Sequence, residues 1–188
     1  MAEARVLEWE GVVVSPVAGA TADEAWPPLS DFLAFHRWNP RVAKCRLAAA
    51  SPRVVRYCEG TPRDGDASEQ EPDWAHETLL EHDAEGRFFR YEMNDNNMGF
   101  GAFFATFRVV PRDAGDGRVE RDGCELRWEF ECEPIRGTPR EALVARLQFG
   151  LDAMAARVQE HVRAARAAEN GVAAAADELN RPDNSIAV

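Results

Sequence analysis

The chain has 188 residues, of which 45% are hydrophobic, and this is enough for one domain with a buried core. Its formal net charge of −11 at pH 7 gives a surface that repels nucleic acids and anionic membranes, so we expect neither as a partner. No apolar run of signal-peptide type lies between Ala2 and Glu10, and no stretch reaches the roughly 20 apolar residues of a membrane span. We therefore expect a cytoplasmic protein.

A strand followed by two short helices is predicted at the start of the chain. The strand, Trp9–Val17, contains three consecutive valines. The first helix begins at a capping box in which Thr21 is the cap and Glu24 stands three residues later, and a pair of prolines should end this helix early. The second helix is predicted from about Ser30 to Trp38, before a further proline.

Six further strands follow, joined mostly by short connections. They are predicted at Val42–Leu47, Arg53–Glu59, Asp73–His82, Arg87–Met93, Phe100–Val110 and Cys124–Glu133. In the last of them, cysteine and large apolar residues alternate strictly with charged residues. This alternation indicates a strand with one buried and one solvated face, which is typical of antiparallel sheets.

A long helix is predicted last. It begins with the N-cap Thr138, a proline at the first helical position and the capping-box residue Glu141. Its apolar stripe recurs at three- and four-residue steps through Leu143, Leu147, Leu151, Met154, Val158 and Val162. We expect the helix to end at the pair Asn170-Gly171. The predicted organisation is a flexible N-terminus at 1–8, a single domain at 9–170 and a disordered tail at 171–188.

This order of elements predicts an α+β fold of the helix-grip type, in which a curved, antiparallel, seven-stranded sheet wraps round the long C-terminal helix. A curved sheet that grips one helix leaves an apolar cavity between them. The candidate cavity residues are Phe89, Tyr91, Phe103, Phe107 and Trp128 on the strands and Leu147, Leu151 and Met154 on the helix. An aromatic stripe on a strand forms core more often than a ligand-binding wall, so both interpretations stand for the aromatic residues.

Two residues of opposite charge, Arg56 and Glu77, occupy neighbouring predicted strands. If their faces point inward, the two groups must pair, because an unpaired buried charge costs many kcal/mol. If the faces point outward, the pair is a surface salt bridge worth ~0–1 kcal/mol. Alternation alone leaves both open, since Val55 and Tyr57 could equally face the core.

Motifs for metal, nucleotide or simple nucleophilic chemistry are missing from the sequence. The four cysteines lack the spacing of a metal site and lie in strand-like runs, so we interpret them as small buried hydrophobic residues. The four histidines form no ligand motif, and neither a glycine-rich phosphate loop nor a G-x-S-x-G elbow occurs. We therefore predict no metal and no cofactor.

Several short motifs resemble the plant lachrymatory factor synthase group within the Bet v 1-like (START-like, polyketide-cyclase-like) superfamily. The resemblance spans Trp9 to Val162, and its motifs are Trp9–Gly11, Glu24–Trp26, Asp31–Phe32, Val55–Tyr57 with Gly60, Trp74–Glu77, Ala105–Thr106, Trp128–Cys132 and Leu147–Gln148. It implies a helix-grip fold with no cofactor.

The same resemblance implies roles for individual residues. Arg56 and Glu77 match the catalytic pair of the group, while Tyr91 and Trp128 match its pocket aromatics. In the implied reaction, an unsaturated sulfenic acid rearranges to a thial S-oxide; Arg56 would anchor the substrate oxygen and Glu77 would carry the proton. Two positions depart from the group: Phe103 replaces a tyrosine, and Gly150 replaces a bulky tryptophan, which should widen the cavity.

Three functional hypotheses follow. The first is an isomerase or cyclase-like enzyme that moves a proton on a small substrate. The second is a non-catalytic binder or carrier of a small hydrophobic or amphipathic molecule. The third is a hormone receptor of the abscisic-acid type, which we disfavour because its Ser-Gly-Leu-Pro gate and His-Arg-Leu latch do not occur.

Overall fold

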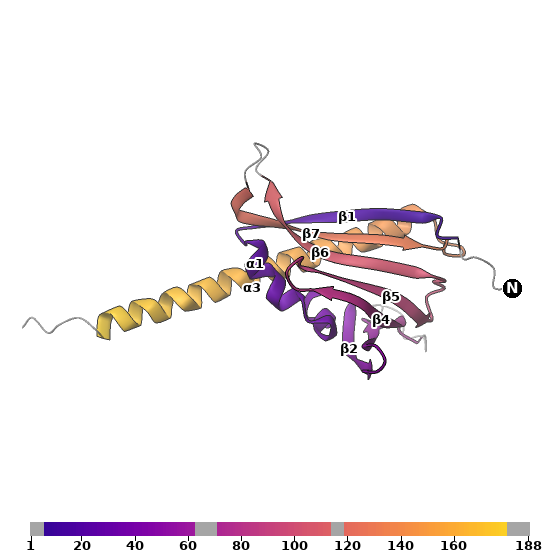
Figure 1. The fold of residues 1–188 in the computed structure, drawn as a ribbon, viewed down its shortest axis with the longest axis horizontal. Helices are drawn as coiled ribbons and strands as arrows, with labels where there is room; N and C mark the ends of the chain where they lie inside the picture. The colour runs from indigo at the N-terminus through magenta and orange to yellow at the C-terminus, as the bar shows by residue number, and fades with distance from the viewer. Residues whose placement is uncertain (1–5, 63–70, 114–118, 180–188) are drawn as a thin grey trace, which may run out of the picture.

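The structure of the protein is a computed structural model, which describes residues 6–62, 71–113 and 119–179 (Figure 1). Its one sheet has seven strands in the order β1-β7-β6-β5-β4-β3-β2, and every neighbouring pair is antiparallel. The strands are β1 Trp9–Ala18, β2 Val42–Ala49, β3 Val55–Gly60, β4 Trp74–Asp83, β5 Phe88–Asn96, β6 Phe103–Asp113 and β7 Val119–Cys132. The predicted seven-stranded antiparallel sheet is confirmed.

Two short helical segments follow β1, as predicted. Helix α1 (Ala22–Leu29) is capped by the expected box: the Thr21 hydroxyl accepts from the Glu24 amide, and the Glu24 carboxylate accepts from the Thr21 amide. The helix contains the two prolines and ends one residue after them. The second predicted helix is split into a 3-10 turn, η1 (Phe32–Ala34), and one α-helical turn, α2 (Phe35–Trp38).

The long helix α3 (Arg140–Leu179) continues past its predicted end. Gly171 does not take the positive φ that would terminate a helix, and the alanine-rich sequence that follows favours helix. The prediction of a disordered tail from residue 171 is therefore wrong for 171–179, while 180–188 and residues 1–5 of the predicted flexible N-terminus lie outside the described residues. In Figure 1 the C-terminal half of α3 extends well beyond the sheet.

The core lies between the concave face of the sheet and α3. The inward residues of β6 and β7 are buried as alternation predicts, and so is the apolar stripe of α3 from Leu143 to Val162. Helix α3 packs mainly on β1 and β7, at one side of the sheet. The concave surface of β3, β4 and β5 is instead approached by η1 and α2, and the candidate site residues Arg56 and Glu77 lie there.

No helix among the described residues is long and apolar enough to cross a membrane. The cytoplasmic location stays a prediction.

An ion pair connects α1 with α3. Arg166 of α3 donates from Nε and Nη2 to the carboxylate of Glu24 in α1, at 2.6 and 2.7 Å. These hydrogen bonds lower the pKa of Glu24 from its ordinary 4.5 to about 2, against the opposing effect of partial burial. A carboxylate whose pKa is lowered by folding stabilises the protein above its unfolded pKa, and this contribution is lost as the pH falls toward the folded value.

We therefore expect urea unfolding to show a fall in stability between about pH 5 and pH 2 that is smaller in Glu24→Gln. Both side chains are about one third exposed, so we expect only about 1 kcal/mol from this pair at neutral pH. The control is Glu160→Gln, which removes a carboxylate from an exposed pair with Arg163 and should leave the profile unchanged. Equal acid sensitivity of Glu24→Gln and the parent protein would contradict the assignment.

Candidate functional site

Arg56 and Glu77 face the interior of the fold. They stand directly opposite each other on β3 and β4, and their exposed fractions are 1% and 6%. The Arg56 Nε donates to Glu77 Oε2 at 2.6 Å. The alternative of a surface salt bridge is therefore excluded, while the catalytic role of the pair stays a prediction.

The outer face of the same strands explains why alternation could not decide the orientation. Tyr57 and Trp74 stack there with ring centroids 6.3 Å apart, His76 packs against both, and the Arg46 guanidinium lies 4.6 Å from the Tyr57 ring centroid. The outer face of β3 and β4 thus carries large aromatic side chains, opposite the face that carries Arg56 and Glu77. An apolar residue on these strands carries no information on which side is the core.

The guanidinium of Arg56 is enclosed by aromatic rings. It lies 3.9 Å from the ring centroid of Phe32, 4.6 Å from that of Phe35 and 5.2 Å from that of Tyr91, and its Nη1 donates to the Phe32 carbonyl at 2.6 Å. Burial opposes the charge, but the Glu77 carboxylate outweighs it and raises the pKa of Arg56 above its ordinary value. The side chain therefore stays cationic and has its hydrogen bonds directed to protein groups.

Glu77 presents its carboxylate differently on its two oxygens. Oε2 accepts a hydrogen bond from Arg56 Nε and lies 3.9 Å from the thiol sulfur of Cys58. Among the hydrogen bonds of the described residues, none involves Oε1. Glu77 also lines a pocket between the sheet, α2 and α3, here called the main pocket, so this carboxylate can accept a hydrogen bond or a proton from a molecule bound there.

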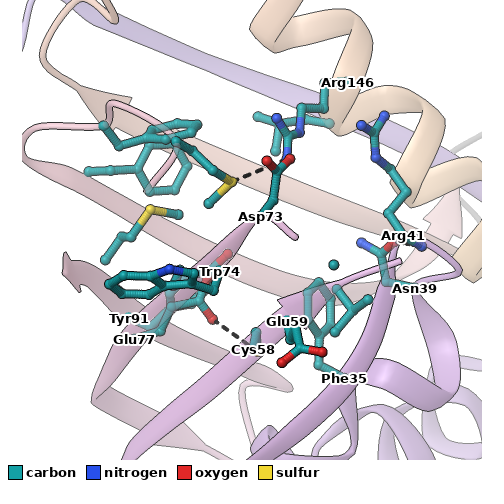
Figure 2. Close-up of a pocket in the computed structure, with 18 of the residues that line it drawn as sticks. Phe35, Asn39, Arg41, Cys58, Glu59, Asp73, Trp74, Glu77, Tyr91 and Arg146 are labelled. Carbon is teal, nitrogen blue, oxygen red and sulfur yellow. Dashed lines mark hydrogen bonds and ion pairs between the residues drawn. The ribbon is translucent and has the colours of Figure 1, made fainter. Parts of the chain in front are cut away.

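The main pocket is a cavity of about 120 Å³ between the concave sheet, α2 and α3 (Figure 2). An apolar cavity of about 150 Å³ in another protein holds benzene, so this volume suits a ligand of about six non-hydrogen atoms. Its apolar walls come from Phe35, Val42, Ala75, Tyr91, Met93, Met98, Phe100, Phe103, Trp128, Leu143 and Leu147.

Charged and amide groups gather at the end of the pocket away from Glu77 (Figure 2). Arg146 of α3 donates from Nη2 to Asp73 Oδ2 at 3.2 Å and lies 3.3 Å from the Met98 sulfur. The Asn39 side chain accepts from the Arg41 amide. Sequence reasoning missed these residues; the available signal was that Arg146 stands three residues after Leu143 and so borders the apolar stripe.

A second cavity of about 10 Å³, room for about one water, lies behind the first. Phe35 and Trp128 line both cavities, and their rings meet edge to face with centroids 5.8 Å apart. Of the sequence-predicted residues, Glu77, Tyr91, Phe103, Trp128 and Leu147 line the main pocket, whereas Arg56, Phe89, Phe107 and Met154 line only the smaller cavity.

Arg56 thus does not contact the main pocket directly, which differs from the anchoring role that the family resemblance implies. Its hydrogen bond to Glu77 Oε2 indicates that Arg56 positions the Glu77 carboxylate instead.

Two predicted pocket residues of α3 line neither cavity. Leu151 is fully buried in the core. At Gly150, a Cβ atom would come within 3.1 Å of the Asn39 side-chain nitrogen. The amide of Asn39 therefore occupies the space that a larger residue at 150 would need. The expectation that Gly150 widens the cavity is wrong for this reason.

The aromatic residues near the carboxylate carry one hydroxyl. Phe103 packs edge to face on Phe100 and parallel to Phe130, so it brings no polar group to Glu77. The Tyr91 hydroxyl accepts from Trp128 Nε1 at 3.1 Å. Burial, reinforced by the negative charge of Glu77, raises the pKa of Tyr91 far above its ordinary value.

The fold is that of the START-like, helix-grip class, and several solved structures are similar to it. A START superfamily protein from Mycobacterium smegmatis has a TM-score of 0.58 at 15% identity, covering 82% of this chain and 97% of its own. Zhui aromatase/cyclase from a Streptomyces species has a TM-score of 0.59 at 16% identity, covering 82% and 94%. A protein from Thermobifida fusca has a TM-score of 0.56 at 28% identity, covering 79% and 93%.

The family model described as polyketide cyclase/dehydrase and lipid transport matches residues 10–159. The chain belongs to this family.

Removing one charge of the buried pair should cost more than removing both. We expect Arg56→Met to lower the unfolding free energy by about 3–5 kcal/mol, because it leaves Glu77 unpaired in the interior. In the double variant Arg56→Met/Glu77→Gln, much of that loss should return. Urea unfolding of the parent protein, Arg56→Met and the double variant measures these free energies. The control is Arg53→Met in the exposed segment just before β3, which should cost less than about 1 kcal/mol. Additive losses in the double variant would contradict the pairing.

The buried phenol should not ionise while the protein is folded. Tyr57 and Tyr91 are the two tyrosines of the chain, so Tyr57→Phe leaves Tyr91 alone to report. Because the folded pKa lies above the unfolded value near 10, the stability that Tyr91 contributes is complete below that pH and is lost as the pH rises above it. We expect phenolate absorbance to appear only together with loss of the circular dichroism signal. Ionisation at the ordinary pKa in folded protein would show that Tyr91 is solvated.

Proposed function

We propose that the protein is a cofactor-independent enzyme that moves a proton on a small, largely apolar substrate, with Glu77 as the proton carrier. The observation that carries this proposal is the asymmetry of the Glu77 carboxylate. Oε2 is held by Arg56, while Oε1 has no hydrogen bond among the described residues and the side chain lines an apolar cavity. Such a group is oriented before a substrate arrives.

The proposed reaction is an isomerisation in which the proton returns to the same substrate. Glu77 takes a proton from one atom of the bound molecule, the electron pair of that bond shifts through an adjacent unsaturated group, and the protonated carboxyl returns the proton to a different atom. No atom is lost and no electron acceptor is needed. Arg56 does not touch the substrate; it is a positioning residue that fixes Oε2 and compensates the charge of the resting state.

The most specific form of the proposal is the lachrymatory factor synthase reaction on an unsaturated sulfenic acid. The paired Arg56 and Glu77 support it. Phe103 stands where that group has a tyrosine, and its apolar ring supplies no second proton donor. We therefore expect slower turnover on a sulfenic acid than on a substrate whose rearrangement needs one proton carrier.

Non-catalytic binding of a small hydrophobic molecule is the second candidate. The observation that favours it is the mainly apolar lining of the pocket, which includes Phe100, Phe103 and Trp128. A carrier would gain affinity from these rings without using Glu77 Oε1.

Proton exchange with solvent separates the two candidates without knowledge of the natural substrate. We expect the protein to catalyse deuterium incorporation next to the carbonyl of cyclohexanone in D₂O, measured by NMR. Glu77→Gln should lower this rate by about 10²–10⁴ because it removes the proton carrier. Glu129→Gln, which changes an exposed carboxylate on the outer face of β7, is the matched control and should leave the rate unchanged.

Because Glu77→Gln leaves the Arg56 charge unpaired, the double variant Arg56→Met/Glu77→Gln serves as the folded reference. The proposal predicts that this variant binds cyclohexanone and exchanges no hydrogen. Exchange at the parent rate in either variant contradicts a role for Glu77. Saturable binding by the parent protein without exchange of cyclohexanone or rearrangement of a sulfenic acid would favour the carrier.

A further inference from the structure

Two cysteines meet in the wall of the pocket. Cys45 on the edge strand β2 stands directly opposite Cys58 on β3, and their sulfur atoms are 3.3 Å apart. Cys58 is buried and lines the main pocket, whereas Cys45 is half-buried. The interpretation of the cysteines as small buried residues therefore holds for Cys58 and for the β7 pair, Cys124 and Cys132, but only in part for Cys45.

The backbone at this pair suits a disulfide. Directly opposed residues of antiparallel strands have Cα atoms about 4.5–5.5 Å apart, and disulfides occur for Cα separations of about 4.4–6.8 Å. Both side chains already lie on the same face of the sheet, with their sulfur atoms in contact. Bond formation therefore requires only a small approach of two side chains and no movement of the strands.

The surroundings give the two thiols different reactivity. A hydrogen bond from Cys58, helped by the positive charge of Arg56, lowers the pKa of Cys45 despite its partial burial. The same hydrogen bond and burial raise the pKa of Cys58 well above its ordinary value. The thiolate is the attacking form of cysteine, so the more accessible Cys45 is the attacking residue and Cys58 the resolving residue.

We propose that Cys45 and Cys58 form an oxidisable dithiol that closes to a reversible disulfide in the pocket wall by exchange with a small-molecule disulfide. With oxidised glutathione, the Cys45 sulfur attacks one glutathione sulfur and the first glutathione thiol leaves. The Cys58 sulfur then attacks Cys45 in the mixed disulfide, and the second glutathione thiol leaves. The two thiol protons end on the two glutathione molecules, and two electrons pass from the protein to glutathione disulfide.

Closure of this disulfide changes the pocket beside Glu77. It removes the Cys58 thiol that lies 3.9 Å from Glu77 Oε2, and it ties the edge strand β2 covalently to β3. The oxidised protein should therefore unfold at a higher temperature than the reduced protein. This inference concerns the thiols and is independent of the proposed proton transfer, so either can fail without the other.

Peptide mapping after treatment with oxidised glutathione tests the proposal. An arginine separates every pair of consecutive cysteines, so each cysteine falls in its own tryptic peptide. In folded protein we expect a disulfide between the peptides of Cys45 and Cys58, with a loss of two hydrogen atoms in mass, and its complete reversal by dithiothreitol. Cys124 and Cys132 should remain thiols, because both are fully buried and burial raises the pKa of each to about 11.

Two single variants act as controls. Cys58→Ser should stop at the glutathione adduct on Cys45, and Cys45→Ser should show neither adduct nor disulfide. The increase in unfolding temperature on oxidation should be absent from both variants.

Three results would overturn the proposal. In the first, both cysteines of the parent protein remain open to alkylation after treatment. In the second, a glutathione adduct persists on Cys45 of the parent protein. In the third, the link involves Cys124 or Cys132.

Discussion

The ion pair between Arg56 and Glu77 is the constraint on which the rest of the site depends. Two charges with exposed fractions of 1% and 6% are stable inside a protein only as partners, because each alone would carry a large desolvation cost. The packing of η1 and α2 meets part of this requirement. They bring a backbone carbonyl and two aromatic rings to the guanidinium and so complete its surroundings.

This arrangement also gives Arg56 and Glu77 different roles. Arg56 donates from Nε to Glu77 and from Nη1 to the Phe32 carbonyl and does not line the main pocket, so it positions Glu77 and does not contact a molecule bound there. The carboxylate, in contrast, lies at the boundary between the buried pair and the apolar pocket. Chemistry in this pocket would therefore pass through one oxygen atom in surroundings of low polarity, where electrostatic interactions are strong.

The sequence predicted the fold well because its signals repeat. The alternation in β7 and the apolar stripe of α3 each involve several residues that agree, so they identify a buried face without a structure. The capping box at Thr21 has a local physical cause and was predicted for the same reason. The end of α3 was not, since Gly171 terminates a helix only when its φ turns positive, and the surrounding alanines keep it helical.

The site was harder to predict because it depends on contacts between distant segments. Arg56 and Glu77 could be paired from strand order, but their inward orientation rested on family resemblance, since Tyr57 and His76 form an aromatic cluster on the other face. Nothing in the local sequence indicates that Asn39 fills the space beside Gly150, or that Phe35 and Trp128 separate two cavities. The first follows from packing of the end of α2 against α3, and the second from packing of α2 against the sheet.

A crystal structure of the protein soaked with cyclohexanone tests the central claim most directly. We predict a ligand in the cavity bounded by Phe103, Trp128 and Leu147, close to Glu77 Oε1, with Arg56 still hydrogen-bonded to Oε2. A Glu77 side chain turned to solvent, or a cavity filled by side chains with the ligand bound elsewhere, would contradict it.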